Sequence, residues 1–317
     1  MNFPNISPEQ NMQDMCLPLR QQGRMAFVMS PRLGDALIAM TLIYNLFKKG
    51  YDITVYSDFM AALKQWFPWV QVFPYPDEAE AKASWNQYDV LLHRYPHDVR
   101  YDSRQWHPCV LSLSTLPFYR QCLNEVDLQL LTAKKIFNIE QPLRANGMTL
   151  PQGFVHRRYL SKVVIHPTAS MKTRYWLPRY FIKLAARLMN KGYEPVFLVA
   201  SHEDEETRWI ETAGFNRMVT TSIENAAEVI GEAGWFIGND SGLGHLASCL
   251  GIPTISMHQR RKVSICWHPG FAPNKALLPR VNLLIKPWKE KYWKYFLTPN
   301  QVYHAFLALV NAEGRQK

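Results

Sequence analysis

The chain has 317 residues, 47% of them hydrophobic, and carries a formal net charge of +10 at pH 7. This composition excludes a largely disordered chain and allows two domains of ordinary size. The positive charge favours a polyanionic partner, such as nucleic acid, an anionic membrane surface or a phosphorylated glycolipid. A basic protein without such a partner is the alternative, because charge alone does not separate the two.

The cysteines and the N-terminal residues bear on the cellular compartment. The five cysteines form no C-x-x-C pair. They therefore indicate neither a disulfide framework nor a zinc site, and a reducing cytoplasm is expected. Residues 1–23 have no apolar stretch of signal-peptide length and are expected to form a flexible extension. The sequence has no run of 18 apolar residues, so we expect no transmembrane helix.

The first half of the chain alternates between predicted strands and helices. Residues 25–30 predict a buried strand, and residues 33–48 predict a helix whose apolar positions recur at 3–4 spacing. Further strands are expected at 52–56, 70–73 and 89–93, and a further helix at 59–67. Periodicity is weak over 95–160, where we expect partial helix at 119–131 and a linker at 143–159. A first domain is therefore predicted over 24–150.

The second half repeats the alternation and predicts a second domain over 151–317. Strands are expected at 162–166, 195–200, 235–237 and 253–257, with helices at 178–190, 204–213, 223–232, 243–250 and 299–311. Strands alternating with helices through short links are typical of doubly wound α/β sheets. Two such halves predict a cleft between them in which ligands bind.

The most informative segment is the turn at 238–245, between a predicted strand and a predicted helix. It contains Asp240, Ser241, Gly242, Gly244 and His245. Small residues let an anionic ligand approach the backbone, and the N–H groups and dipole at a helix start attract phosphate. The segment therefore predicts a nucleotide diphosphate site. A glycine-rich turn with a simple helix cap is the structural alternative, and the spacing does not match the dinucleotide fingerprint.

Three separated motifs resemble glycosyltransferase family nine, the ADP-heptose:lipopolysaccharide heptosyltransferases. They are RLGD at 32–35, HPTASMKTRYWLP at 166–178, and GNDSGLGHLA at 238–247 followed by GIP. The resemblance implies a GT-B fold, with two Rossmann-like domains whose parallel sheets face a central cleft. It also implies inverting, metal-independent transfer from a nucleotide-sugar donor, ADP-heptose, to a lipopolysaccharide core acceptor, with no cofactor. This chain departs from the family pattern at Arg174, at Leu177 and over 256–262.

The first motif carries the predicted acceptor side of the site. Glycosyl transfer needs a base for the attacking hydroxyl, and Asp35 follows the first strand at the edge of the predicted sheet. The family has its catalytic aspartate in the same Gly-Asp pair, so the resemblance implies that Asp35 is the base and that Arg32 and Gly34 bind the acceptor. A helix cap is the alternative role for Asp35.

The other two motifs carry the predicted donor side. The resemblance implies that the nucleotide and its diphosphate contact Thr168, Ser170, Lys172, Arg174, Glu203, Asp240, Ser241, Gly242, Gly244 and His245. Either Lys172 or Arg174 could bind phosphate, and both could be solvated loop charges. Glu203 could accept the ribose hydroxyls or could belong to a charged helix start. We expect Asp240 to hold sugar hydroxyls or to orient a cation rather than to contact phosphate, because like charges repel.

The remaining predictions concern partners. Residues 286–296 mix lysine with Trp, Tyr and Phe, which suits the anionic surface of the inner membrane, although an aromatic packing strip is equally consistent. The alternative functions are transfer to a protein or another glycan from a different donor, and sugar-nucleotide binding without catalysis. Nucleic-acid binding is not expected, because no binding-module motif accompanies the charge.

Overall fold

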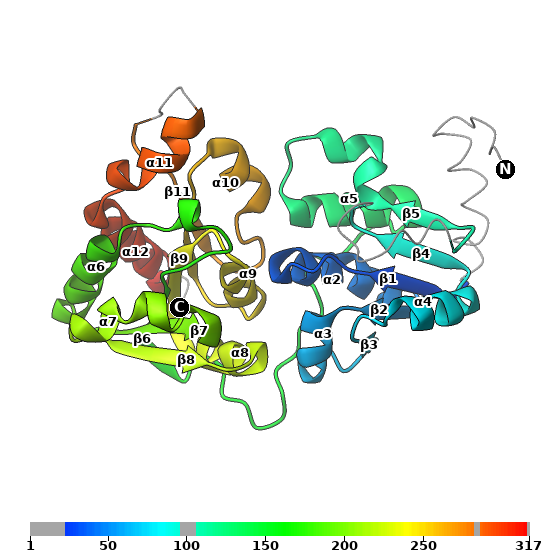
Figure 1. The fold of residues 1–317 in the computed structure, drawn as a ribbon, viewed down its shortest axis with the longest axis horizontal. Helices are drawn as coiled ribbons and strands as arrows, with labels where there is room; N and C mark the ends of the chain where they lie inside the picture. Colours follow the sequence, from blue (N-terminus) through cyan, green and yellow to red (C-terminus); the bar gives the residue numbers. More distant parts are fainter. Residues whose placement is uncertain (1–22, 96–105, 282–285, 316–317) are drawn as a thin grey trace. The chain divides into compact units, whose positions relative to one another are not determined.

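The structure is a computed structural model, and it describes residues 23–95, 106–281 and 286–315 (Figure 1). The chain divides into two compact units. The first comprises Met1–Gln121 and Val126–Thr149, and the second comprises Cys122–Glu125 and Leu150–Lys317. Each unit is an α/β unit built on a parallel sheet, which confirms the fold class predicted from the alternation of strands and helices. Apart from Gly23, the predicted N-terminal extension lies outside the described residues.

The described part of the first unit contains a five-stranded parallel sheet in the order β3-β2-β1-β4-β5. Its strands are β1 (Met25–Val28), β2 (Ile53–Tyr56), β3 (Gln71–Phe73), β4 (Val90–His93) and β5 (Val110–Ser112). The α-helices are α2 (Leu33–Lys48), α3 (Asp58–Ala62), α4 (Glu78–Ser84) and α5 (Glu125–Phe137), the last beginning at the boundary between the units. The strand order reverses between β1 and β4, which makes their carboxyl ends the topological switch point of this sheet.

Burial in the first unit explains why the early elements were predictable. β1 and β4 are buried along their whole length, as expected for central strands of a parallel sheet. Alternate residues of these strands pack on Trp85 beside α4. Helix α2 follows β1 directly and is buried over most of its length. Asp35 is therefore carried by an element that packing holds rigidly on several sides.

The predicted helix at 59–67 is interrupted in the structure. Helix α3 ends at Ala62, and a 3-10 turn, η1 (Lys64–Trp66), follows it. Trp66 and Phe67 are fully buried, so the chain turns both rings into the core. Pro68 comes next, and a proline disfavours helical geometry at the residue before it. These two effects end the regular helix before the periodicity of the sequence does.

The described part of the second unit contains a six-stranded parallel sheet in the order β11-β10-β9-β6-β7-β8. Its strands are β6 (Tyr159–His166), β7 (Glu194–Ala200), β8 (Asn216–Thr220), β9 (Ala233–Asn239), β10 (Thr254–Met257) and β11 (Asn274–Leu277). Its α-helices are α6 (Pro178–Asn190), α7 (Trp209–Thr212), α8 (Ile223–Gly231), α9 (Gly242–Cys249), α10 (Arg261–Trp267), α11 (Lys286–Phe296) and α12 (Pro299–Gly314). The order reverses between β9 and β6, and these strands lie at the centre of the sheet.

Helices cover both faces of the second sheet (Figure 1). On one face, inward residues of α6, α11 and α12 pack on alternate residues of the central strands in one large hydrophobic cluster. Helix α6 begins with Pro178 at its first position and ends before Gly192, whose φ of +87° favours glycine. Helix α12 begins with a capping box between Thr298 and Gln301. These local signals explain why α6 and α12 were readable from the sequence.

The segment predicted as one helix at 204–213 is divided between a 3-10 turn and a short α-helix. Turns η7 (Ser201–Glu203) and η8 (Glu205–Thr207) precede α7, which contains only four residues. Thr207 Oγ1 donates to the carbonyl of Glu203 at 2.7 Å, and such back-bonding competes with regular helix. Sequence periodicity also did not predict α4, β5, β8, α10 and β11, which are short or weakly periodic. Within the described ranges, no helix is long and apolar enough to cross a bilayer.

Candidate active site

Polar residues of the second unit, of which Glu203 was predicted and His166, Asn239 and His258 were not, lie at one edge of its sheet. His166 ends β6, Asn239 ends β9 and His258 follows β10, while Glu203 lies just after β7. Because all six strands are parallel, their carboxyl ends meet at the same edge. Ligands of doubly wound sheets bind at this edge near the switch point, here between β9 and β6. The topology therefore brings residues from four separate loops to one place.

A buried chain of hydrogen bonds crosses this edge. His166 Nδ1 lies 3.1 Å from Ser241 Oγ, and its Nε2 lies 2.9 Å from Thr168 Oγ1. Thr168 Oγ1 in turn donates to Glu203 Oε1 at 2.5 Å, and the backbone N–H of Ala200 donates to Glu203 Oε2 at 2.8 Å. These hydrogen bonds connect the loops after β6, β7 and β9. They therefore fix the positions of the three loops relative to one another.

The direction of these hydrogen bonds assigns the protons. Thr168 gives its only hydroxyl proton to Glu203, so its oxygen accepts from the Nε2–H of His166. The other ring nitrogen of His166, Nδ1, faces the hydroxyl of Ser241. Burial raises the pKa of Glu203, but His166, the Ala200 N–H and Thr168 outweigh it and hold the pKa at about 2. Glu203 is therefore ionised, with both carboxylate oxygens engaged inside the protein.

Asn239 was not predicted as a site residue, yet it fixes the loop that follows β6. Its Nδ2 donates to the carbonyl of Pro167 at 2.7 Å, and its Oδ1 accepts from the backbone N–H of Trp176 at 3.1 Å. The side chain is fully buried. Both ends of the 167–176 loop are thereby fastened to β9. The signal in the sequence was an asparagine next to Asp240, at the end of an otherwise apolar strand.

Asp240 and Arg174 form an ion pair beside α9. Arg174 Nη1 lies 3.2 Å from Asp240 Oδ2, and the aspartate side chain is 12% exposed. Burial raises the pKa of Asp240, and Arg174 opposes this by favouring the carboxylate. Asp240 orients the guanidinium of Arg174 near the start of α9 and neutralises part of its charge. The forked N–H donors of a guanidinium suit phosphate oxygens.

Two buried histidines lie in the same corner of the second unit. Burial lowers the pKa of His245 to about 4 and that of His258 to about 3, so both are neutral at pH 7. His258 Nε2 lies 2.9 Å from Ser256 Oγ, and its Nδ1 lies 3.8 Å from Asp240 Oδ1. A neutral His245 offers a phosphate a hydrogen bond rather than a full positive charge. Positive charge at this edge therefore comes from the arginines.

The start of α9 has the local structure expected of an anion site. Ser241 is the N-cap residue, but its side chain makes no capping hydrogen bond and contacts His166 instead. Gly242 begins the helix with no side chain to block approach. The first N–H groups of the helix and its dipole therefore point toward the edge where Arg174 lies.

The structure separates the two candidate cations. The side chain of Lys172 is 83% exposed and pairs with Glu206 at 3.0 Å, whereas that of Arg174 is 29% exposed and pairs with Asp240. Both belong to the 3-10 turn η6 (Lys172–Arg174). Ser170 lies earlier in the same loop and is exposed. The geometry therefore brings Arg174 to the start of α9 and leaves Lys172 paired on the surface.

The first unit places Asp35 at its own switch point. Asp35 lies in the first turn of α2, is 8% exposed, and accepts a hydrogen bond from Ser30 Oγ at 3.1 Å. Gly34 is buried beside it, and Arg32, the N-cap residue, is exposed. Serine and aspartate both follow β1, so they lie outside the carboxyl end of a central strand. This is where an open α/β sheet binds ligands.

Arg94 is a further cation at this edge, and the sequence motifs did not indicate it. It follows β4, is 5% exposed, and its guanidinium lies 4.4 Å from the ring centres of both Tyr95 and Tyr119. Stacking on two rings holds a guanidinium in one plane and lowers the cost of burying it. An arginine directly after the apolar strand at 90–93 was the available signal.

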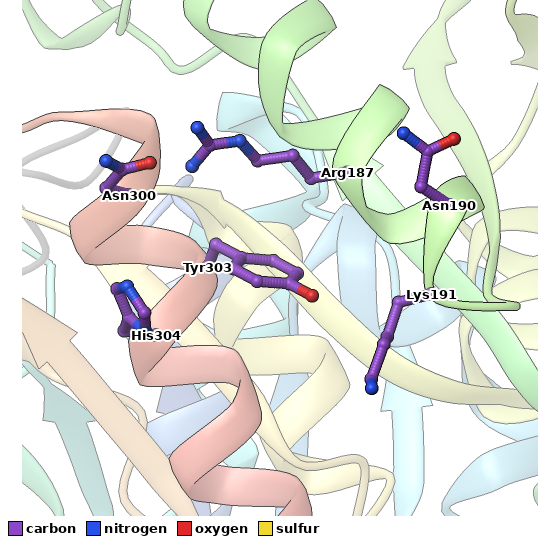
Figure 2. A pocket seen from close by; sticks show the side chains of 6 residues that line it. All are labelled: Arg187, Asn190, Lys191, Asn300, Tyr303 and His304. Atoms are coloured by element: carbon purple, nitrogen blue, oxygen red, sulfur yellow. The ribbon is translucent and has the colours of Figure 1, made fainter.

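A surface pocket of about 370 Å³ lies elsewhere, between α6 and α12 (Figure 2). Figure 2 shows Arg187 extending from α6 toward α12, and Tyr303 extending back from α12. Because α6 runs from the carboxyl end of β6 to the amino end of β7, its last turn lies at the opposite edge of the sheet from Asp240. Five of the six lining residues are exposed. The basic residues there interact favourably with the dipole at the end of α6, and they are remote from the candidate donor site.

Two parallel-sheet α/β units, each with polar residues at its switch point, form the architecture expected of the GT-B class of glycosyltransferase folds. A model of glycosyltransferase family 9 (heptosyltransferase) matches residues 79–264, more than half of the chain. The chain belongs to this family, which confirms the resemblance that its motifs predicted. No curated protein sequence matches the chain. In the part that the structure describes, no group of three or more His, Cys, Asp or Glu is arranged to hold a metal ion.

Solved structures share the fold at low sequence identity. The chain is similar to an E. coli ADP-heptose lps heptosyltransferase II, with a TM-score of 0.70 and 15% identity over 92% of this chain and 99% of that one. It is similar to a family 9 glycosyltransferase from Veillonella parvula, with a TM-score of 0.71 and 14% identity over 92% and 98%. It is also similar to E. coli heptosyltransferase WaaC with ADP, with a TM-score of 0.67 and 15% identity over 90% and 99%.

Proposed function

We propose that this protein is an inverting glycosyltransferase that transfers heptose from ADP-heptose to a lipopolysaccharide core acceptor. The observation that carries the proposal is the ion pair of Arg174 and Asp240 beside the start of α9, in a chain of family 9. A nucleotide diphosphate carries its charge on phosphate oxygens, and a helix start with a neighbouring arginine is a site of the matching chemistry. One similar protein, E. coli heptosyltransferase WaaC, has been solved with ADP and with ADP-2-deoxy-2-fluoro heptose.

In the proposed reaction, Asp35 accepts the proton of the acceptor hydroxyl. The hydroxyl oxygen attacks the anomeric carbon of the donor sugar, the bond from that carbon to the diphosphate breaks, and ADP leaves with the electron pair. Attack opposite the leaving group inverts the anomeric centre. Asp35 suits this role because it is held by a rigid helix beside the hydroxyl of Ser30. Arg32, Gly34 and Arg94 are the proposed neighbours of the acceptor.

The donor side uses the second unit. Arg174 and the first N–H group of α9, at Gly242, stabilise the charge that develops on the departing diphosphate, whereas the N–H of Gly244 already donates to the carbonyl of Ser241. Asp240 holds Arg174 in place and can turn its other oxygen toward sugar hydroxyls, while His245 donates a neutral hydrogen bond. We propose that Thr168, Ser241 and Glu203 shape the nucleotide pocket. We also propose that the positive charge of Arg174 makes the transfer metal-independent.

The test begins with binding of ADP, UDP and GDP by calorimetry, followed by transfer from ADP-heptose with and without EDTA. We expect ADP to bind at least tenfold more tightly than UDP or GDP, and turnover to survive EDTA with an inverted product. Tighter binding of UDP or GDP would instead favour transfer from another donor, to another glycan or a protein. Binding of ADP-heptose without transfer to any acceptor would favour a non-catalytic sugar-nucleotide-binding protein.

A further inference from the structure

Helix α11 presents aromatic side chains to solvent along one face. Trp288 is 56% exposed, Tyr292 39% and Tyr295 45%. Their spacing of four and three residues places them on one side of the helix. We refer to these three residues as the aromatic stripe. These three side chains of the 286–296 segment are therefore not used for internal packing, whereas Trp293 is buried.

The opposite side of α11 is what packs on the protein. Trp293 is 1% exposed and belongs to the hydrophobic cluster of the second unit, as does Leu297, just after the helix. The helix is therefore fixed by one set of residues and displays another. A large exposed apolar surface rimmed by polar groups is uncommon on a protein that has no partner there.

The charge of α11 identifies the partner. Its sequence, KPWKEKYWKYF, contains four lysines and one glutamate. Lys291 is exposed beside the stripe, with its ammonium 5.4 Å from the ring centre of Tyr292. Trp and Tyr have an apolar body and a polar tip, which suits the boundary between lipid headgroups and acyl chains, and lysines suit anionic headgroups. We infer that the aromatic stripe and Lys291 bind the surface of a bilayer containing anionic phospholipid.

The same helix is tied to the candidate donor loop. Trp293 Nε1 donates to the carbonyl of Thr173 at 2.9 Å, and Trp176 Nε1 donates to the carbonyl of Leu297 at 2.7 Å. Thr173 lies between Lys172 and Arg174 in η6. Helix α11, which would contact the bilayer, is therefore hydrogen-bonded to the candidate donor loop. That this surface brings the enzyme to a lipid-borne acceptor rests on the proposed function. That the surface binds lipid does not rest on it.

The test is sedimentation of the full-length protein with vesicles, in the absence of donor and acceptor. We expect binding to phosphatidylcholine vesicles that contain about a quarter phosphatidylglycerol. Partition should fall at least tenfold with pure phosphatidylcholine, or when salt is raised from about 0.1 M to about 0.5 M, which shortens the screening length. Absence of binding to the anionic vesicles, or equal binding to both kinds, overturns the inference.

Variants locate the surface. Replacing the stripe by Trp288→Ser, Tyr292→Ser and Tyr295→Ser should lower partition into anionic vesicles at least tenfold, and Lys291→Glu should lower it at least threefold. A matched control replaces three exposed apolar residues elsewhere, Phe73, Tyr159 and Leu160, by serine and should bind as wild type does. If the stripe variant loses its helical circular dichroism, Lys291→Glu decides the question. Unchanged partition for a folded stripe variant overturns the inference.

The oligomeric state distinguishes a lipid surface from a contact between two copies of the chain. A dimer in sizing columns that only the stripe variant disperses would assign the surface to a second copy and overturn the lipid assignment. Transfer to a water-soluble acceptor should be unchanged in the stripe variant, while transfer to an acceptor in anionic vesicles should fall about tenfold. Failure of all transfer, with vesicle binding intact, would count against the proposed function and leave the lipid surface standing.

Discussion

The two sheets carry their charged groups at equivalent edges but hold them differently. In the second unit, Glu203 and Asp240 are each engaged by neighbours from other loops, and their charges are compensated inside the protein. In the first unit, Asp35 lies in the first turn of a buried helix with the hydroxyl of Ser30 as a donor. A site for a diphosphate needs charges that stay fixed, whereas a base must exchange a proton during the reaction. Under the proposed function, the edge of the second sheet is the donor edge and that of the first sheet is the catalytic edge.

The largest expected effect tests the catalytic edge. Asp35→Asn should lower kcat by about 10²–10⁴, because the variant keeps the shape but cannot accept the proton. The Kd for ADP should stay within about twofold, since ADP is proposed to bind the other unit, and the melting temperature should barely change. Asp52→Asn, which alters an exposed aspartate of the same unit, is the control. A kcat within tenfold of wild type would remove Asp35 from the proposed mechanism.

The next effect separates the two cations of the donor loop. Arg174→Ala should weaken ADP binding about 10–100-fold, because it removes a charge-assisted hydrogen bond and leaves Asp240 without its partner. Arg174→Lys should give a Kd for ADP between those of wild type and Arg174→Ala, since lysine keeps the charge but lacks the forked donors of a guanidinium. Lys172→Ala should change the Kd by less than about threefold, because its pair with Glu206 is on the surface. Calorimetry that ranks Lys172 above Arg174 would reverse the assignment.

A stability measurement tests whether the donor edge is preorganised as described. Thr168→Val removes the hydroxyl that joins His166 to Glu203 and leaves a buried carboxylate one donor short. We expect a loss of about 1–3 kcal/mol in the free energy of unfolding, measured with urea. Thr212→Val is the matched control, because the hydroxyl of Thr212 is exposed. Equal effects of the two substitutions would show that the buried chain adds little stability.

The smallest effect uses pH. His245 and His258 have pKa values of about 4 and 3 in the folded protein, below the 6.5 of an unperturbed histidine, because burial penalises their charged forms. As pH falls below 6.5, both histidines bind protons in the unfolded chain but stay neutral in the folded protein. The free energy of unfolding therefore decreases toward pH 4. Between pH 7 and pH 5.5 each histidine should cost about 1 kcal/mol. His245→Gln should remove its share of this loss, and an unchanged pH slope would contradict the assignment.

The sequence indicated several of the residues that the structure brings to the carboxyl edge of the second sheet. The turn at 238–245 was readable because a strand, small residues and a helix follow one another within a few positions. His166, Asn239 and Arg94 were missed as site residues, although each lies at the end of an apolar strand. Their roles depend on which loops lie next to one another, and local spacing does not report that. Short elements such as α4 and β8 were missed for a related reason, since few residues give little periodicity.

By itself, the sequence determined the alternation of strands and helices, both ends of α6, the start of α12, and the family motifs, because each depends on residues close together in the chain. The tertiary structure alone decided which distant residues meet. It paired Arg174 with Asp240, linked Thr168 to Glu203, and buried one side of α11 while leaving the aromatic stripe in solvent. Parallel strands bring loops far apart in the chain to one edge, and only the order of the strands in the sheet says which loops these are.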